Sequence, residues 1–277
     1  MDTYGCGCRA CEELRWTFEV NTRQGPQCDM MKRIKEHGKA NHLLLTAAPT
    51  AMATLIVGPN KHRILCPKPL LGYHSEFFDA ALYGSFSAAQ SGEVQMPDED
   101  VKEITVFINW IYSGTVIITD ESEVTKYWLL GERLISSRFA NEVMYSIFNK
   151  FLRVHAEPTF CENCYAGTIP GCKLRKFARD LIIFNPPALP QGQDKNYSIY
   201  LAANVVNAES THEWWEIIRK GGDLVLDVCT RGSFTHLPGH LNQPSPCAPV
   251  NHHRYLLPTT TRPIEEFLEG RPRTTLH

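Results

Sequence analysis

Residues 53–113 read ATLIVGPNKHRILCPKPLLGYHSEFFDAALYGSFSAAQSGEVQMPDEDVKEITVFINWIYS, and the order of elements within them points to a fold class. They begin with two short apolar runs, Thr54–Val57 and Arg63–Cys66, on either side of Gly58-Pro59-Asn60-Lys61. Glycine, proline and asparagine in a row are typical of a turn, so this segment predicts a β-hairpin.

The rest of this stretch predicts helices and one more strand. A helical run covers Lys68–Tyr83 and is interrupted at Gly84, and Glu93–Met96 then predicts a third strand. The stretch closes with an amphipathic helix, whose expected inner face is Val101, Ile104, Ile108, Ile111 and Tyr112. It carries no arrangement of nucleophile, base or phosphate loop, so it is predicted to pack and to bind.

This order of elements resembles the core of a BTB/POZ domain, and closely those of the BTB proteins of filamentous fungi. Five pieces carry the resemblance in the family's order: Thr54–Gly58, Cys66–Leu71, Ser75–Leu82, Glu93–Asp98 and Ile108–Gly114. The resemblance implies an α+β fold, with a small three-stranded sheet and a cluster of helices, over residues 49–155. Pro67 departs from the family's usual His, and no acidic residue precedes Thr54, at positions that have structural or dimer-related roles in the family.

Residues 1–48 are expected to form a cysteine-containing extension ahead of this domain. Their sequence predicts a short helix over Asp29–His37 that ends near Gly38. In some BTB proteins a helix at this place exchanges with a dimer partner. The alternative is a loosely ordered extension, because chain ends are mobile unless they pack.

The residues after Gly114 predict elements that complete the domain. The β-branched run Thr115–Thr119 favours a short edge strand. A helix then starts near Asp120 or Ser122, either of which can cap its free N–H groups, and a second helix covers Ser137–Phe151. The first of these helices has an expected apolar face of Val124, Tyr127, Trp128, Leu134 and Ile135.

Residues 156–230 are predicted to form a mainly helical C-terminal extension. Residues 158–170 read as a connection, and Gly171–Phe184 reads as an amphipathic helix that ends before two prolines. Thr211–Cys229 predicts a helix that breaks at Gly221-Gly222.

Residues 231–277 predict a disordered tail. They are rich in Pro, Thr, His and Arg and poor in periodic apolar residues. Only Ile264–Leu268 indicates a turn of helix within this tail.

The composition is that of an ordinary globular chain. The 277 residues, 43% of them apolar, allow a sizeable core in one or two domains of about 100–200 residues. Lys and Arg number 28 and Asp and Glu 30, so a net charge of −2 offers no bulk attraction to nucleic acid or an anionic membrane. With neither a signal-peptide pattern nor an apolar run of about 20 residues, an intracellular, soluble protein with reduced thiols is expected.

Two groups of cysteines raise the alternative of a zinc-binding regulatory protein, because zinc takes four Cys or His ligands. The first group is Cys6, Cys8, Cys11 and Cys28, and the second is Cys161, Cys164 and Cys172 with His155 as candidate fourth ligand. The first group lacks a second close pair and the second is one cysteine short. Free thiols are therefore the preferred interpretation, and no metal or other cofactor is predicted. The C-x-x-C spacing in the second group also fits a redox motif, but Gly167 and Pro170 stand where its helix should run.

No catalytic signature is complete. The segment His212–Glu216 begins like a zincin motif but has Glu where the second His is required. His252-His253 falls in the predicted tail and is expected to be solvated. A non-enzymatic protein is therefore predicted. Four basic residues follow the pattern of a solvated helix face, and the basic surface they would form is too narrow to bind nucleic acid. They are Lys173, Arg175, Lys176 and Arg179.

The resemblance implies a protein–protein interaction module that forms homo- or hetero-oligomers or acts as a scaffold. As an alternative it implies a substrate adaptor of a cullin-type ubiquitin ligase. Members that bind cullin carry an apolar-x-Glu motif, where this chain has Phe86, Ser87 and Ala88. Phe86 keeps the apolar anchor, but Ala88 cannot accept the hydrogen bond of a glutamate. The other candidate partner-binding residues are Leu70, Tyr73 and Phe77, in the first helical run.

Overall fold

The computed structural model describes residues 26–46, 51–118, 121–152, 156–184, 208–231, 245–259 and 262–269. These residues divide between two compact units. The first takes the described parts of 1–118, 130–139 and 259–277, and the second takes those of 119–129 and 140–258. The predictions made for Cys6, Cys8, Cys11, His155 and the Cys28 side chain lie outside what the structure describes.

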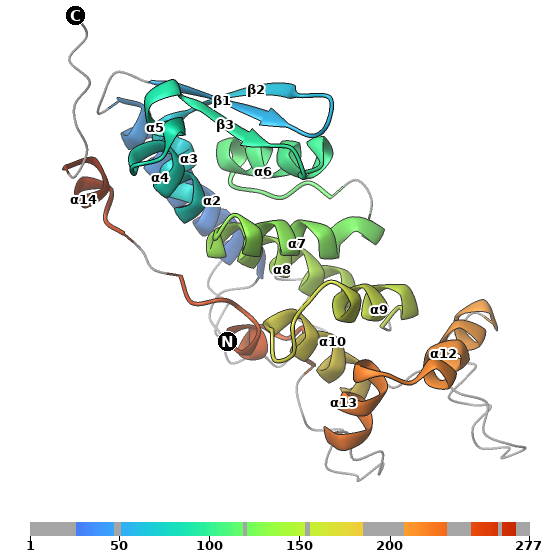
Figure 1. The fold of residues 1–277 in the computed structure, drawn as a ribbon. Coiled ribbons are helices and arrows are strands. Elements are labelled where there is room, and N and C mark those ends of the chain that lie inside the picture. Colours follow the sequence, from blue (N-terminus) through green and yellow to red (C-terminus); the bar gives the residue numbers. More distant parts are fainter. Residues whose placement is uncertain are drawn as a thin grey trace, which may run out of the picture. The chain divides into compact units, whose positions relative to one another are not determined.

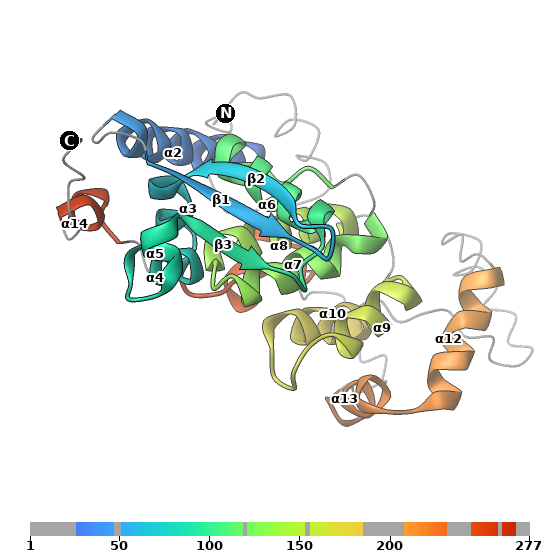
Figure 2. The same cartoon turned by 45° about the horizontal axis from the view of Figure 1, so that its top comes forward.

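The first unit contains a three-stranded sheet (Figures 1 and 2). Its strands, in the order β2-β1-β3, are β1 (Met52–Val57), β2 (His62–Pro67) and β3 (Glu93–Met96). β1 pairs antiparallel with β2 and parallel with β3, so Leu55 lies opposite both Ile64 and Val94. The β1–β2 turn places Gly58 at φ +70°, which glycine adopts without strain. The predicted hairpin and third strand are confirmed.

Four helices of the same unit are α3 (Lys68–His74), α4 (Glu76–Tyr83), α5 (Ser87–Ser91) and α6 (Val101–Ser113). In Figure 1, α3, α4 and α6 lie on one side of the sheet. The single helical run predicted over residues 68–83 is two helices, because Ser75 between them is extended at φ −148°. The Ser75 Oγ accepts a hydrogen bond from the Phe78 N–H (3.1 Å) and donates one to the Leu134 carbonyl (2.6 Å). It therefore caps α4 and ties that helix to a distant part of the chain.

Helix α6 buries most of its predicted face. Ile104, Ile108 and Ile111 are buried as expected. Tyr112 is exposed instead, because it lies about 100° around the helix from its predecessor. Phe107 joins the inner face, and its ring meets the Phe139 ring edge-on with centroids 5.1 Å apart.

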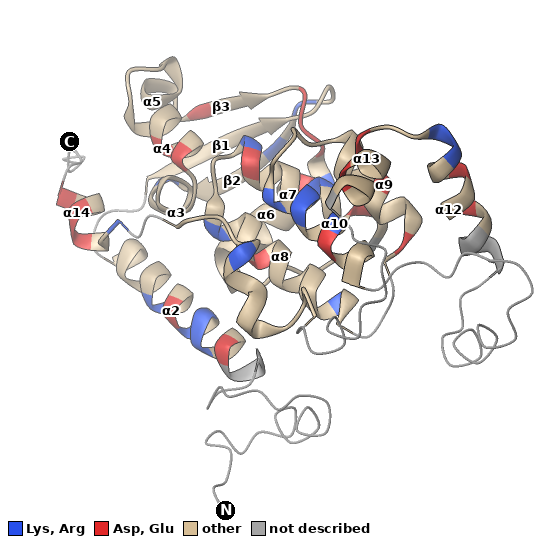
Figure 3. Ribbon diagram, turned by 90° about the horizontal axis from the view of Figure 1, so that it is seen from below, with Lys and Arg blue, Asp and Glu red and all other residues tan. Residues whose placement is uncertain are grey.

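Helix α2 (Pro26–Thr46) is 21 residues long and does not end near Gly38 as predicted. Glycine weakens a helix interior by about 1 kcal/mol relative to alanine, but the residues beyond it compensate by packing. Ala40, Asn41 and Leu44 are all buried. Figure 3 shows basic and acidic residues interspersed along α2, the pattern of a solvated surface.

The edge strand predicted over residues 115–119 is wrong for its described part, since residues 115–118 pair with no strand. The Ser113 Oγ accepts from the Thr115 N–H (3.1 Å) and donates to the Thr115 carbonyl (3.0 Å), so this run begins with its backbone groups used locally. A 3₁₀ turn at residues 121–123 then leads into α7 (Val124–Arg133), and α8 covers Ser137–Phe151 as predicted.

The predicted apolar face of α7 is correct except at its end. Val124, Tyr127, Trp128 and Leu134 are buried. Ile135 is exposed because the helix stops at Arg133, and the left-handed φ of +48° at Ile135 places it in the turn before α8.

Besides parts of α7 and α8, the second unit contains the helices α9 (Pro158–Ala166), α10 (Lys173–Phe184), α12 (Ala208–Lys220) and α13 (Asp223–Arg231). The connection predicted over residues 158–170 is wrong, because Pro158 opens α9 rather than breaking it; proline fits the first turn of a helix, where its missing N–H is no loss. The predicted break at Gly221-Gly222 is confirmed, and both glycines have positive φ.

Two segments of the predicted tail have definite structure. Residues 245–259 contain a 3₁₀ helix (Pro249–Arg254), and α14 covers Ile264–Glu269. The expectation that His252 is solvated is wrong, because its ring stacks on Phe148 with centroids 4.1 Å apart. Its Nε2 also lies 2.8 Å from the Cys247 carbonyl. Within the ranges that the structure describes, no helix combines the length and the apolar character needed to cross a bilayer.

Candidate interaction surface

Three polar side chains of the first unit, of which Asn41 and His74 are buried and His37 is half-buried, join α2 to α3 and α6. The His37 Nε2 and the Asn41 Nδ2 each lie 2.6 Å from the Ile111 carbonyl at the end of α6. The His74 Nε2, on α3, lies 2.8 Å from the Asn41 Oδ1. The two histidine rings stack with centroids 4.5 Å apart, and both meet the Trp110 ring at 5.2 Å. This polar cluster (His37, Asn41, His74) fixes α2 against the domain.

The electrostatics of this cluster keep His74 neutral. Burial, with the His37 ring and the Arg138 guanidinium nearby, lowers the pKa of His74 well below its usual value of 6.5. The Asn41 amide donates to a carbonyl through Nδ2, so its Oδ1 accepts and the His74 Nε2 carries the proton. The His74 Nδ1 is a buried acceptor with no hydrogen-bond partner among the described residues. His74 therefore has a structural role and does not act as an acid or a base near neutral pH.

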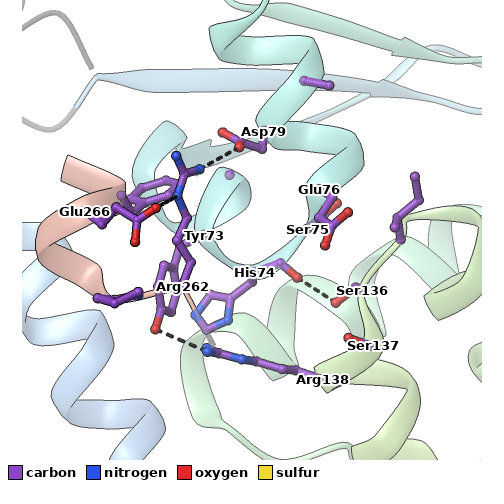
Figure 4. Close-up of a pocket in the computed structure, with 15 residues that line it drawn as sticks. Tyr73, His74, Ser75, Glu76, Asp79, Ser136, Ser137, Arg138, Arg262 and Glu266 are labelled. Atoms are coloured by element: carbon purple, nitrogen blue, oxygen red, sulfur yellow. Dashed lines mark hydrogen bonds and ion pairs between the residues drawn. The ribbon is translucent and has the colours of Figure 1, made fainter. Parts of the chain in front are cut away.

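A pocket of about 560 Å³ opens beside this cluster (Figure 4). Its walls are the end of α3 and start of α4, the turn at residues 135–138, and residues 262–267 around α14. The Ser136 Oγ donates to the His74 carbonyl (2.6 Å), which fixes the turn against α3. The Arg138 guanidinium donates to the Tyr73 hydroxyl (3.3 Å) and lies 4.8 Å from the centre of that ring. The pocket thus has aromatic and charged walls, which suit a peptide better than a purely apolar ligand.

The predicted partner-binding residues do not form one surface. Phe86 precedes α5 and is 61% exposed, with Ser87 exposed and Ala88 half-buried beside it. Leu70 is fully buried, so its assignment as a partner-binding residue is wrong in this conformation; it lies on the core side of α3. Tyr73 lines the pocket. The half-buried Phe77 ring packs against Phe78, with centroids 5.1 Å apart.

Several residues of the cluster and the pocket could not be predicted as site residues from the sequence. His37, Asn41 and Arg138 are polar residues on helices, and their spacing is that of a solvated face. Phe267 lies in the predicted tail, where the apolar character of Ile264–Leu268 was the one hint of packing.

The described cysteines of the second group, Cys161, Cys164 and Cys172, form no metal site with other described residues. Cys161 and Cys164 lie on α9 and are fully buried, and burial raises the pKa of both thiols. The Cys164 Sγ lies 4.0 Å from the Thr125 hydroxyl, and the Cys172 Sγ accepts from the Arg175 N–H at 3.4 Å. Among the described residues, no three His, Cys, Asp or Glu side chains are grouped to hold a metal ion. Protonated, buried thiols also make poor nucleophiles for redox exchange.

Arg175 is buried, which corrects its assignment to a solvated face. Its guanidinium pairs with Asp223 (3.1 Å) and donates to the Tyr165 carbonyl (2.8 Å), the Thr168 hydroxyl (2.9 Å) and the Thr168 carbonyl. It also lies 4.9 Å from the centre of the Tyr165 ring. Arg175 therefore joins α10 to the end of α9 and to α13.

Comparisons with known proteins identify the domain that contains the three-stranded sheet. Residues 52–150 match the family model of the BTB/POZ domain. The chain is similar to a solved structure of the BTB (Tramtrack and Bric a brac) domain of human Gigaxonin, at 13% identity and a TM-score of 0.29, covering 46% of this chain and 97% of that chain. No curated protein matches. Residues 52–150 therefore form a BTB/POZ domain, a kind of domain that binds other proteins, and the predicted α+β fold with a helical C-terminal region is confirmed.

Proposed function

We propose that this chain is a non-enzymatic interaction protein that assembles with a copy of itself, or with another chain, through its BTB/POZ domain. The match of residues 52–150 to the domain family carries this proposal. We further infer, from the five sequence pieces quoted above, that the domain is of the filamentous-fungal type.

The length of α2 supports homodimerisation in particular. The resemblance implies that a helix ahead of the core takes part in dimers of some members, and α2 runs for 21 residues before β1. The polar cluster holds one face of α2 to the domain. Other faces expose apolar side chains, among them Met31, Leu43 and Leu45. Apolar groups held on a rigid helix are suited to burial against a second chain.

The oligomeric state tests this proposal directly. We expect a dimer by light scattering at micromolar concentration, and we expect Leu45→Glu to shift it toward monomer because a charge would enter the interface. Leu226→Glu is the matched control, since Leu226 is also an exposed leucine on a helix but lies in the second unit. A wild-type chain that is strictly monomeric under these conditions, and that captures no other protein through residues 52–150, would refute the proposal.

A cullin adaptor is the second candidate, favoured by the exposure of Phe86. An apolar ring exposed at the start of α5 is available to insert into a partner, whereas Ala88 offers no carboxylate. We expect a cullin to co-purify with the wild-type chain and to be lost on Phe86→Ala. Ala88→Glu should strengthen that binding by restoring the acceptor. Co-purification that survives Phe86→Ala would count against the contact.

A further inference from the structure

Helix α14 is a short segment that packs on the first unit, where it contacts α2 and buries one aromatic side chain. It has six residues, Ile264–Glu269, and helices of that length are unstable in water on their own. Phe267 is only 1% exposed, while Glu265 and Glu266 on the same helix are exposed. The helical form of α14 therefore depends on the docking of Phe267.

A slot formed by α3 and the end of α4 accepts the Phe267 ring. The Phe267 ring meets Tyr73 and Tyr83 edge-on, with centroids 5.5 Å and 6.2 Å apart. Gly72 makes the room, because a Cβ at that position would lie 2.9 Å from the Tyr83 ring and 3.3 Å from the Phe267 ring. The slot is thus shaped for an aromatic side chain that arrives from outside the domain core.

Charge complementarity sets the direction of the segment. The Arg262 Nη1 lies 3.3 Å from the Asp79 Oδ2 on α4, and its Nε lies 3.8 Å from the Glu266 carboxylate (Figure 4). The same guanidinium lies 5.7 Å from the centre of the Phe267 ring. A basic residue and an aromatic residue in the segment therefore meet an acidic residue and an aromatic slot on the domain.

The segment leaves part of the groove open. The pocket of about 560 Å³ lies beside it, with Glu76, Ser137 and Arg138 on the opposite wall. A guanidinium has five N–H donors, and Arg138 uses one of them on Tyr73. The open part of the groove beside this polar wall can therefore hold a ligand that extends beyond the space taken by residues 262–269.

We propose that this groove, formed by Gly72, Tyr73, Asp79 and Tyr83 with the turn at residues 135–138, binds a short helix of a partner protein. That helix carries an aromatic anchor and a preceding basic residue, spaced as Phe267 and Arg262 are. Residues 262–269 occupy the groove as a tethered ligand that the partner displaces. The inference rests on the proposed interaction function of the domain and deepens it. Tethering raises the local concentration of the segment to about the millimolar range, so a free helix binds well only when the tethered segment is weakened.

The test uses the full-length chain and a fluorescent peptide with the sequence of residues 259–269, TTTRPIEEFLE. We expect Phe267→Ala protein to bind the peptide at least about tenfold more tightly than wild-type protein, because its own segment no longer fills the slot. A peptide with alanine at the position of Phe267 should not bind. Phe184→Ala protein is the matched control, an identical substitution of an exposed ring on α10 of the second unit, and should bind the peptide as weakly as wild type. Adding Asp79→Asn to Phe267→Ala should weaken peptide binding several-fold.

If Phe267→Ala fails to melt cooperatively, Arg262→Glu is the second variant, since it opposes Asp79 and leaves the ring in place. Folded variants that bind the peptide no more tightly than wild type would overturn the proposal. It would also be overturned if Phe267→Ala turned a wild-type dimer into a monomer, because the occupant would then be the segment of a second copy. The peptide-binding measurement does not depend on the oligomeric state of the protein. A negative result in it therefore leaves the light-scattering test of the proposed function unaffected.

Discussion

Acidification should destabilise the first unit through His74. This ring is 3% exposed, stacks on His37 of α2 and faces Arg138 of α8, and its Nε2 is committed to Asn41. Protonating it would place a charge in a site that already has a cation nearby and no carboxylate among its hydrogen-bond partners. The native state therefore excludes the proton that the unfolded chain accepts.

The sign and size of the effect follow from linkage. The pKa of His74 is lower in the folded chain than the usual 6.5, so the unfolded chain binds more protons below that pH. The stabilisation is complete above about pH 6.5 and is lost as pH falls, by about 1.4 kcal/mol at one pH unit lower while the native ring stays neutral.

Urea denaturation followed by circular dichroism measures this loss, with His74→Gln as the control. Glutamine keeps an N–H donor for Asn41 but does not titrate. Between about pH 7.5 and about pH 5.5, the free energy of unfolding of the wild type should fall by about 1.4 kcal/mol more than that of the variant. All other ionisable groups are the same in the two proteins, so their contributions to the difference cancel. Equal losses in the two proteins would show that His74 is not held neutral, and the reasoning would be wrong.

Three substitutions test the packing. Gly38→Ala should raise the free energy of unfolding by up to about 1 kcal/mol, because the position lies inside α2 with nothing within 4 Å of an added Cβ; a loss would show that α2 ends there. Gly114→Ala should destabilise more than Gly171→Ala: both glycines have positive φ, but only at Gly114 would the Cβ meet His37, at 3.1 Å. Arg175→Met should lower the free energy of unfolding by about 2 kcal/mol in urea denaturation, since the buried Tyr165 carbonyl and the half-buried Thr168 lose their donor; a change under about 1 kcal/mol would contradict its anchoring role.

The fold could be predicted because its signals are local. The β1–β2 turn needs a glycine at positive φ and has one, and α6 repeats its apolar residues at helical spacing. The wrong predictions fall at residues whose type is compatible with two different local structures. A glycine such as Gly38 ends a helix unless later residues pack, and Pro158 breaks a helix unless it begins one. Tertiary packing decides both cases, and the spacing of apolar residues within one segment carries no information about that packing.

The groove and the polar cluster could not be predicted for a different reason, which is sequence separation. Asp79 and Arg262 are 183 residues apart, and Asn41 lies 70 residues from the carbonyl to which it donates. Each of these residues, taken alone, is an ordinary surface residue by composition. The same holds for α14, where a single phenylalanine in a polar, proline-containing segment does not offset the entropy of ordering it unless a slot already exists elsewhere. Gly72 creates that slot by lacking a side chain. A segment that reads as disordered is therefore ordered by a cavity of the domain, and its order should persist only while no stronger ligand fills that cavity.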